Sequence, residues 1–336
     1  MARASGILAV WLLTSAACAS TRLPPAASGP AWPPAPESAR VAYVRSVSRP
    51  EDLGIRRGVL RTTADVIFGA APRRLVRPMA VAIGMDGTLF VADPGAGGVH
   101  RFDRVRRRYS LLRRREGALP SPVGLAVASD GTLYATDSRL NAVFVLAPGA
   151  RAFTLLPTGP LSRPTGIALD ETRARLYVVE TAAHRIAVFG LSGARAGMLG
   201  ERGDGKGTLN FPTLASVDAG GRLWIADSMN FRILAFEPDG AAGAAFGKVG
   251  DGSGDFARPK GIAVDGDGHL WVVDGLHSAV QVFDPEGNLL LRIGERGGGP
   301  GEFLLPAGIA VRGSDIAVAD ALNARVQLFL YRGGEP

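Results

Sequence analysis

The chain contains very little cysteine, lysine or aromatic residue. Its 336 residues include one cysteine, so no disulfide bond can form within the chain. Lysine occurs only at Lys206, Lys248 and Lys260, although lysine and arginine together number 38. Aromatic residues make up 7% and fall mostly in apolar, strand-like segments, which leaves few for stacking on bases. We therefore expect a fold held by packing and backbone hydrogen bonds, and we expect no nucleic-acid partner.

Long apolar runs are also missing, except near the N-terminus. Arg3 precedes an apolar run over residues 6–13, and small residues follow this run up to Ala17. The run is too short to span a bilayer, which needs about 20 residues. A positive charge, an apolar run and then small residues are typical of a secretory signal. The sequence therefore predicts a signal peptide over residues 1–17 and an exported chain.

The single cysteine, Cys18, directly follows this predicted signal. The segment resembles the lipobox of bacterial lipoproteins, in which the cysteine after small residues is acylated and becomes the mature N-terminus. It departs from the usual pattern at Ser15, where the family has leucine. The alternative is an ordinary signal with an incidental cysteine, but an exported chain rarely keeps an unused free thiol. The resemblance implies a lipid anchor in the cell envelope, and Ala19, rather than aspartate, favours the outer membrane.

Residues 18–39 are rich in proline, alanine and serine and show no hydrophobic period. Such a composition cannot form a core, so this segment is predicted to be an extended tether between the lipid and a folded domain. That domain is expected to cover residues 40–332.

Six internal repeats organise the domain. A proline opens each repeat, and a short apolar strand, a turn such as Asp86-Gly87 and a second strand ending on an acid follow. The prolines are Pro78, Pro122, Pro164, Pro212, Pro259 and Pro306, and the acids are Asp93, Asp137, Glu180, Asp227, Asp274 and Asp320. Four short strands in a repeat of about 45 residues are typical of a propeller blade.

The repeat resembles the NHL family, whose pattern is Pro-x-Gly-apolar-Ala, then a strand ending on Asp, then Asn-x-Arg. Residues 227–233 and 320–326 carry the last part fully, and the resemblance covers about residues 76–331. It implies an all-β fold, a six-bladed β-propeller of four-stranded blades.

The sixth repeat lacks an outer strand, because few residues follow its third strand. Residues 40–47 alternate like a strand and belong to no repeat, so we predict that they complete blade six and close the ring. Between this strand and blade one, residues 55–68 fit a short amphipathic helix. This helix would pack against the propeller or lie on the membrane surface.

At one end of the propeller channel, the loops that enter the first strands are expected to meet the loops that join the second and third strands. Polar side chains recur in these loops. As a set they could present a polar ring to a ligand; alternatively, each bonds to neighbouring loop backbone because the blade repeats. These candidates are Asn141, His184, Arg185, Asn230, Arg232, His277, Asn323 and Arg325.

Arginine is clustered near the end of the first repeat. Such a cluster could attract anionic headgroups or an acidic partner, or it could be a solvated rim. Its members are Arg104, Arg106, Arg107, Arg108, Arg113, Arg114 and Arg115.

Two enzyme families share this architecture. Calcium lactonases of the gluconolactonase type need oxygen ligands, but the predicted inner strands are apolar, with Lys260 as their only charge. Peptidyl-hydroxyglycine lyases bind zinc through three histidines, whereas His184 and His277 lack a third partner at matching positions. We therefore expect no metal and no cofactor. The favoured hypothesis is a non-catalytic, membrane-anchored module that docks an envelope protein or other ligand; the alternative is a metal-dependent propeller enzyme.

Overall fold

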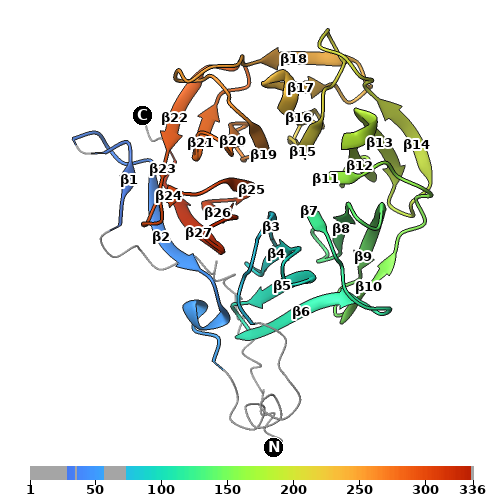
Figure 1. Ribbon diagram of the computed structural model, residues 1–336, viewed down its shortest axis with the longest axis horizontal. Helices are drawn as coiled ribbons and strands as arrows, with labels where there is room; N and C mark the ends of the chain where they lie inside the picture. The colour runs from blue at the N-terminus through green and yellow to red at the C-terminus, as the bar shows by residue number, and fades with distance from the viewer. Residues whose placement is uncertain (1–28, 35, 57–72, 334–336) are drawn as a thin grey trace, which may run out of the picture.

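The computed structural model describes residues 29–34, 36–56 and 73–333. These residues form the six β-sheet blades of a propeller around a central channel, as Figure 1 shows; blades one and two belong to one continuous sheet. The predicted all-β, six-bladed propeller is therefore confirmed. Cys18 and most of the predicted helix over 55–68 lie outside the described residues. In the described ranges, no helix has the length and apolar composition needed to cross a membrane.

The first three blades each have four strands. Blade one consists of β3 (Ala80–Ile83), β4 (Leu89–Asp93), β5 (Gly98–Asp103) and β6 (Arg108–Arg114). Blade two consists of β7 (Pro122–Val127), β8 (Leu133–Asp137), β9 (Ala142–Leu146) and β10 (Ala152–Leu155). Blade three consists of β11 (Pro164–Asp170), β12 (Arg175–Glu180), β13 (Arg185–Gly190) and β14 (Arg195–Leu199), with a short 3-10 turn, η2 (Thr181–Ala183), before β13.

Blades four and five repeat this order, and blade six differs at its outer side. Blade four consists of β15 (Pro212–Val217), β16 (Leu223–Asp227), β17 (Arg232–Phe236) and β18 (Ala242–Phe246), with η3 (Ser228–Asn230) before β17. Blade five consists of β19 (Pro259–Val264), β20 (Leu270–Asp274), β21 (Ala279–Phe283) and β22 (Leu289–Ile293). The paired strands β23 (Glu295–Arg296) and β24 (Glu302–Phe303) precede blade six, which contains β25 (Pro306–Arg312), β26 (Asp315–Asp320) and β27 (Arg325–Tyr331).

An N-terminal strand closes the ring, as the sequence predicts. Strand β2 (Val41–Val47) pairs antiparallel with β27 from Val41 to Val47, and Figure 1 shows β2 alongside β27. A further two-residue strand, β1 (Ala31–Trp32), pairs with β2. The Trp32 ring packs edge-on against Phe329 at a centroid distance of 5.9 Å. Part of the segment predicted to be an extended tether is thus a fifth strand of blade six, which its proline-rich composition did not indicate.

Blades one and two are joined at their outer edges. Strand β6 pairs in parallel with β10, with Arg113 opposite Ala152 and Arg114 opposite Phe153. This pairing covers two strand edges that would otherwise be open to other chains. It makes these two blades a continuous eight-stranded sheet.

The core consists of six apolar clusters, one between each pair of neighbouring blades. The second strand of every blade is buried on both faces, because a neighbouring blade covers each side. This explains why these strands are continuously apolar in sequence instead of alternating. The cluster between blades six and one also includes Val47 and Ile55, so the closing strand contributes to packing as well as to pairing.

The glycine of the Pro-x-Gly pattern allows the inner strands to approach one another. A Cβ atom at Gly308 of blade six would lie 2.7 Å from the Met79 carbonyl oxygen and 2.8 Å from Ala80 Cα of blade one. A Cβ at Gly261 would lie 2.7 Å from the Ala307 carbonyl oxygen in the same way. The channel is therefore narrow because glycine lets successive backbones pack in direct contact.

The substitution Gly308→Ala is expected to lower the free energy of unfolding by about 1–3 kcal/mol, because the added methyl group overpacks the closing contact between blades six and one. Gly197→Ala is the matched control. No atom lies within 4 Å of a Cβ placed at Gly197 in the outer strand β14, so this change should be neutral or stabilising by about 0.5–1 kcal/mol. Urea unfolding of the two variants measures the difference, and equal stabilities would contradict the close-approach argument.

Candidate functional site

The six strand-end acids are completely buried and hold the loops that enter their own blades. Asp93 accepts hydrogen bonds from the backbone N–H groups of Val76 at 2.7 Å and Arg77 at 3.0 Å. Asp274 accepts in the same way from Ala257 at 2.7 Å and Arg258 at 3.1 Å. These carboxylates therefore determine the path of the chain just before each blade-opening proline.

The Asn-x-Arg residues of blades four and six are bound within their own blades. Asn230 donates to Asp227 at 2.7 Å and to the Gly203 carbonyl oxygen at 2.8 Å. The Arg232 guanidinium donates to Asp227 and to three carbonyl oxygens of the loop over residues 204–208. Asn323 and Arg325 make the equivalent set of bonds around Asp320 and the loop over residues 297–302. These side chains therefore use their hydrogen-bond donors to hold the loop against the strand-end acid of the same blade.

The other sequence candidates are also engaged in local contacts. Asn141 and His184 both have a left-handed backbone, with φ of 53° and 54°, and occupy the position of Phe231 in blade four, not that of Asn230. Asn141 accepts a hydrogen bond from Arg163 N–H at 3.1 Å, and His184 Nδ1 accepts one from Phe211 N–H at 3.2 Å.

Arg185 and His277 each lie beside the strand-end acid of their own blade. Arg185 pairs with Glu180 at 2.7 Å, five residues after the acid, as Arg232 does with Asp227. His277 follows Asp274 by three residues, as Asn230 follows Asp227, and its Nδ1 lies 3.4 Å from the Asp274 carboxylate. His184 and His277, the two histidines compared with the zinc ligands of lyases, therefore occupy different places in their blades.

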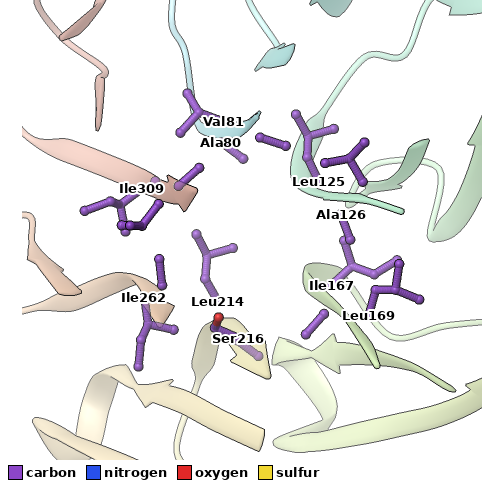
Figure 2. A pocket seen from close by; sticks show the side chains of 18 of the residues that line it. Ala80, Val81, Leu125, Ala126, Ile167, Leu169, Leu214, Ser216, Ile262 and Ile309 are labelled. Atoms are coloured by element: carbon purple, nitrogen blue, oxygen red, sulfur yellow. The ribbon is translucent and has the colours of Figure 1, made fainter. Parts of the chain in front are cut away.

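The central channel is lined by the first strands and is mostly apolar. Figure 2 shows side chains of these strands, including Val81, Leu125, Ile167 and Ile262, around a cavity of about 190 Å³. The polar exceptions among the described lining residues are Ser216 and Arg312. The expectation that Lys260 is the only charge of the inner strands is wrong, since Arg312 at the end of β25 also lines this cavity.

A second, larger cavity of about 570 Å³ opens on the face where the loops entering the blades converge. Leu214 lines both cavities, and Figure 2 shows its side chain pointing into the channel. Blade four has Leu214 in the place where blades two, three, five and six have glycine. We call the larger cavity the loop-face cup.

Three repeat positions supply most of the loop-face cup. All six residues that follow the blade-opening prolines line it, together with most of those that precede these prolines or follow the strand-end acids. The lining residues are Arg77, Met79, Pro94, Ser121, Val123, Ser138, Arg163, Thr165, Thr181, Phe211, Thr213, Leu214, Ser228, Met229, Arg258, Lys260 and Ala307. The face is the one that the sequence indicated, but none of its eight candidate residues lines the cup. Comparing the repeats at the positions on either side of each proline would have found the lining.

Burial lowers the pKa of Lys260 below its ordinary value of 10.5, and the positive charges of Arg258 and Arg77 lower it further. Arg258 and Arg77 therefore each lie close enough to Lys260 to repel its positive charge. No carboxylate is among the described residues that line the cup.

The predicted arginine cluster is divided between the two faces of the propeller. Arg104 and Arg106 lie in the β5–β6 turn and pair with Asp315 at 3.7 Å and Asp86 at 3.5 Å, in the hairpins of the opposite face. Arg113 and Arg114, at the other end of β6, donate to the carbonyl oxygens of Ala96 and Ala118 near the loop face. These arginines are close in sequence, but β6 lies between them and is about 20 Å long. The single patch that the sequence suggested is therefore two separate groups.

One group of potential metal-ligand atoms occurs in the described part of the chain, formed by Asp265, Asp267 and His269 in the β19–β20 hairpin. Asp265 accepts hydrogen bonds from Trp271 Nε1 at 2.8 Å and from His269 N–H at 2.9 Å. These bonds occupy Asp265 within the hairpin, away from the cup.

Two family models match the C-terminal part of the chain. A model described as a 6-bladed beta-propeller matches residues 266–333, and a model described as an SMP-30/Gluconolactonase/LRE-like region matches residues 219–294. No curated protein sequence matches the chain.

Solved structures show the same fold at low sequence identity. An auxiliary nutrient binding protein from Bacteroides thetaiotaomicron has a TM-score of 0.62 and 12% identity, over 78% of this chain and 71% of that chain. A protein of unknown function from the same organism has a TM-score of 0.60 and 18% identity, over 77% and 70% of the two chains. Virginiamycin B lyase from Staphylococcus aureus has a TM-score of 0.56 and 17% identity, over 76% and 95%.

The substitution Asp93→Asn tests the role of the strand-end acids. Burial disfavours the charged Asp93, but the His100 imidazole and the N–H groups of Val76 and Arg77 outweigh it and hold the pKa below its ordinary value of 3.8. A lowered folded-state pKa stabilises the protein above pH 3.8, and this contribution is lost as the pH falls through the folded-state pKa. The variant should therefore be less stable by about 1–3 kcal/mol at pH 7, with a smaller difference at pH 3.

Urea unfolding at both pH values measures these differences. Glu116→Gln, at an exposed turn of the same blade, is the control and should change stability by less than about 0.5 kcal/mol. A pH-independent loss in Asp93→Asn would mean that its ionisation does not contribute.

Proposed function

We propose that this six-bladed β-propeller is a non-catalytic binding module of the bacterial cell envelope that holds a ligand in its loop-face cup. The cup itself is the observation that carries the proposal. Its volume of about 570 Å³ is in the range of small-molecule sites, and its lining combines apolar side chains with a few convergent polar groups. Residues from every blade contribute, so the complete ring is needed to form it.

The fold relatives support binding as a use of this architecture. Auxiliary nutrient binding proteins of Bacteroides share the propeller with this chain at 12% identity. The alternative, a metal-dependent enzyme, draws on the similarity to virginiamycin B lyase. Among the described residues, the cup lining offers no carboxylate, imidazole or thiol, which are the usual metal ligands and proton-transfer groups. This lining favours binding over catalysis.

We further propose that Cys18 anchors the protein to the outer membrane through a lipid. The proposal rests on the small residues before Cys18, the absence of any other cysteine and the proline-rich segment that follows. A cysteine carrying two or three acyl chains binds a bilayer firmly, whereas one chain binds only marginally. The anchor would keep the cup near the membrane without restricting its orientation.

Filling the cup should abolish ligand binding. A small-molecule extract of the source cells is expected to raise the melting temperature of the wild-type protein, because a ligand that binds only the folded state stabilises it. Ser138→Trp places a large side chain in the cup and should remove this response. Arg139→Trp is the matched control, since Arg139 is the exposed next residue and does not line the cup.

Equal responses of the two tryptophan variants, or none in the wild type, would contradict ligand binding in the cup. Metal analysis of the same preparations tests the enzymatic alternative. Stoichiometric calcium or zinc would favour it.

The substitution Cys18→Ser should move the protein from the membrane fraction to the soluble fraction, because it removes the acceptor for the acyl chains. Fractionation of cells that express either form, followed by immunoblotting, measures the change. If the serine variant still sediments with membranes, the attachment does not depend on Cys18.

A further inference from the structure

Positive charge enters the loop-face cup from alternate blades. The residue before the blade-opening proline is Arg77 in blade one, Arg163 in blade three and Arg258 in blade five, whereas blades two, four and six have Ser121, Phe211 and Leu305 there. Lys260 adds a fourth cation from blade five, and all four cations line the cup. Figure 1 shows β3, β11 and β19, which follow these arginines, on different sides of the channel.

These cations lack acidic partners in the described part of the chain. Other arginines at this face are paired, such as Arg185 with Glu180 and Arg232 with Asp227. The carboxylates of Asp93 and Asp274 bind the backbone N–H groups of Arg77 and Arg258, and neither forms an ion pair with the guanidinium of that arginine. These two strand-end acids thus hold the backbone of Arg77 and Arg258 and leave the charge of both side chains available to a ligand.

Two threonine hydroxyl groups of the cup form hydrogen bonds between neighbouring blades. Thr165 donates to the Thr213 carbonyl oxygen at 2.8 Å, and Thr213 donates to the Lys260 carbonyl oxygen at 2.8 Å. A hydroxyl has one hydrogen, so these two threonines cannot also donate to a ligand. The charged groups that the cup offers to a ligand are the guanidinium and ammonium groups.

We propose that the loop-face cup is an anion site and that its ligand is a small organic molecule with two or more carboxylate or phosphate groups. One carboxylate can pair with one or two of these side chains, but cations on three separate blades need several anionic groups. Phe211, Met79 and Met229 offer apolar contacts to the rest of the ligand. This inference rests on the proposed function, and it adds the chemical class of the ligand.

Holding several positive charges together in the empty cup is unfavourable, and an anionic ligand would remove this repulsion. Lys260 is held in a partly buried position beside Arg258 and Arg77, which disfavours its charged form. Bound anions would supply the missing opposite charge. A cation that destabilises the empty cup and strengthens binding is expected at a site built for an anion.

Lys260→Met tests the inference in the full chain, purified in a non-ionic detergent. Citrate and pyrophosphate are the carboxylate and phosphate probes, and glucose is the neutral probe; titration calorimetry and melting temperature are the measurements. At least one anion should bind the wild type, glucose should not, and Lys260→Met should weaken the bound anion about 10-fold or more. Without ligand, this variant should melt at a higher temperature than the wild type.

Two control variants separate charge from structure. Lys206→Met removes an exposed lysine outside the cup and should change the affinity less than about 2-fold. Lys260→Arg keeps the positive charge and should retain most of the binding. Failure of both anions to bind the wild type, or equal binding by Lys260→Met, would overturn the inference.

Fractionation of the cell extract distinguishes this inference from the proposed function. The component that stabilises the wild type but not Ser138→Trp should be retained on an anion-exchange resin at neutral pH. If it flows through, the cup binds a ligand but the ligand is not anionic. If no component stabilises the wild type, the proposed function itself is wrong.

Discussion

The hydrogen bond between a buried strand-end carboxylate and the loop before each proline is the interaction on which the rest of this structure depends. Asp93 shows the arrangement: its two oxygens accept the N–H groups of Val76 and Arg77 and position the chain before the first strand of blade one. A charged carboxylate without exposure to water is costly unless hydrogen bonds satisfy it. Breaking these bonds would release the loop and leave a buried charge unsatisfied. The acid therefore positions the loop, and the loop stabilises the acid.

The same interaction links the fold to the cup. The side chains on either side of each proline project from backbone that the strand-end acids hold, and these side chains form most of the lining. The Pro-x-Gly pattern then brings neighbouring inner strands into contact, which keeps the channel narrow beneath the cup. Leu214, at one of the two positions without this glycine, lies between the cup and the channel. The ring can thus carry different residues at the loop face of each blade without a change in its core.

Much of the fold could be predicted from the sequence because each blade repeats the same local requirements. The prolines, the turn dipeptides and the strand-end acids mark every blade, and residues 40–47 were the one strand available to complete blade six. The short strand at Ala31–Trp32 could not be predicted, because its pairing depends on β2 and its packing on Phe329, far away in the sequence. The arginine cluster was interpreted as one surface for a similar reason, since proximity in sequence does not show that a strand separates its two ends.

The candidate site was predicted less well, and the reason is physical. Repetition of Asn-x-Arg marked Asn230, Arg232, Asn323 and Arg325 as candidates, but a residue also repeats when every blade needs the same hydrogen bonds. The cup differs from blade to blade, so its arginines at positions 77, 163 and 258 do not belong to the repeated pattern. By itself, the sequence determined the number of blades, the order of strands and the closure of the ring, because local strand and turn preferences repeat along the chain. Only the tertiary structure decided which polar groups are used within the blades and which face the cup, because the cup forms only where the loops of six blades, far apart in sequence, converge.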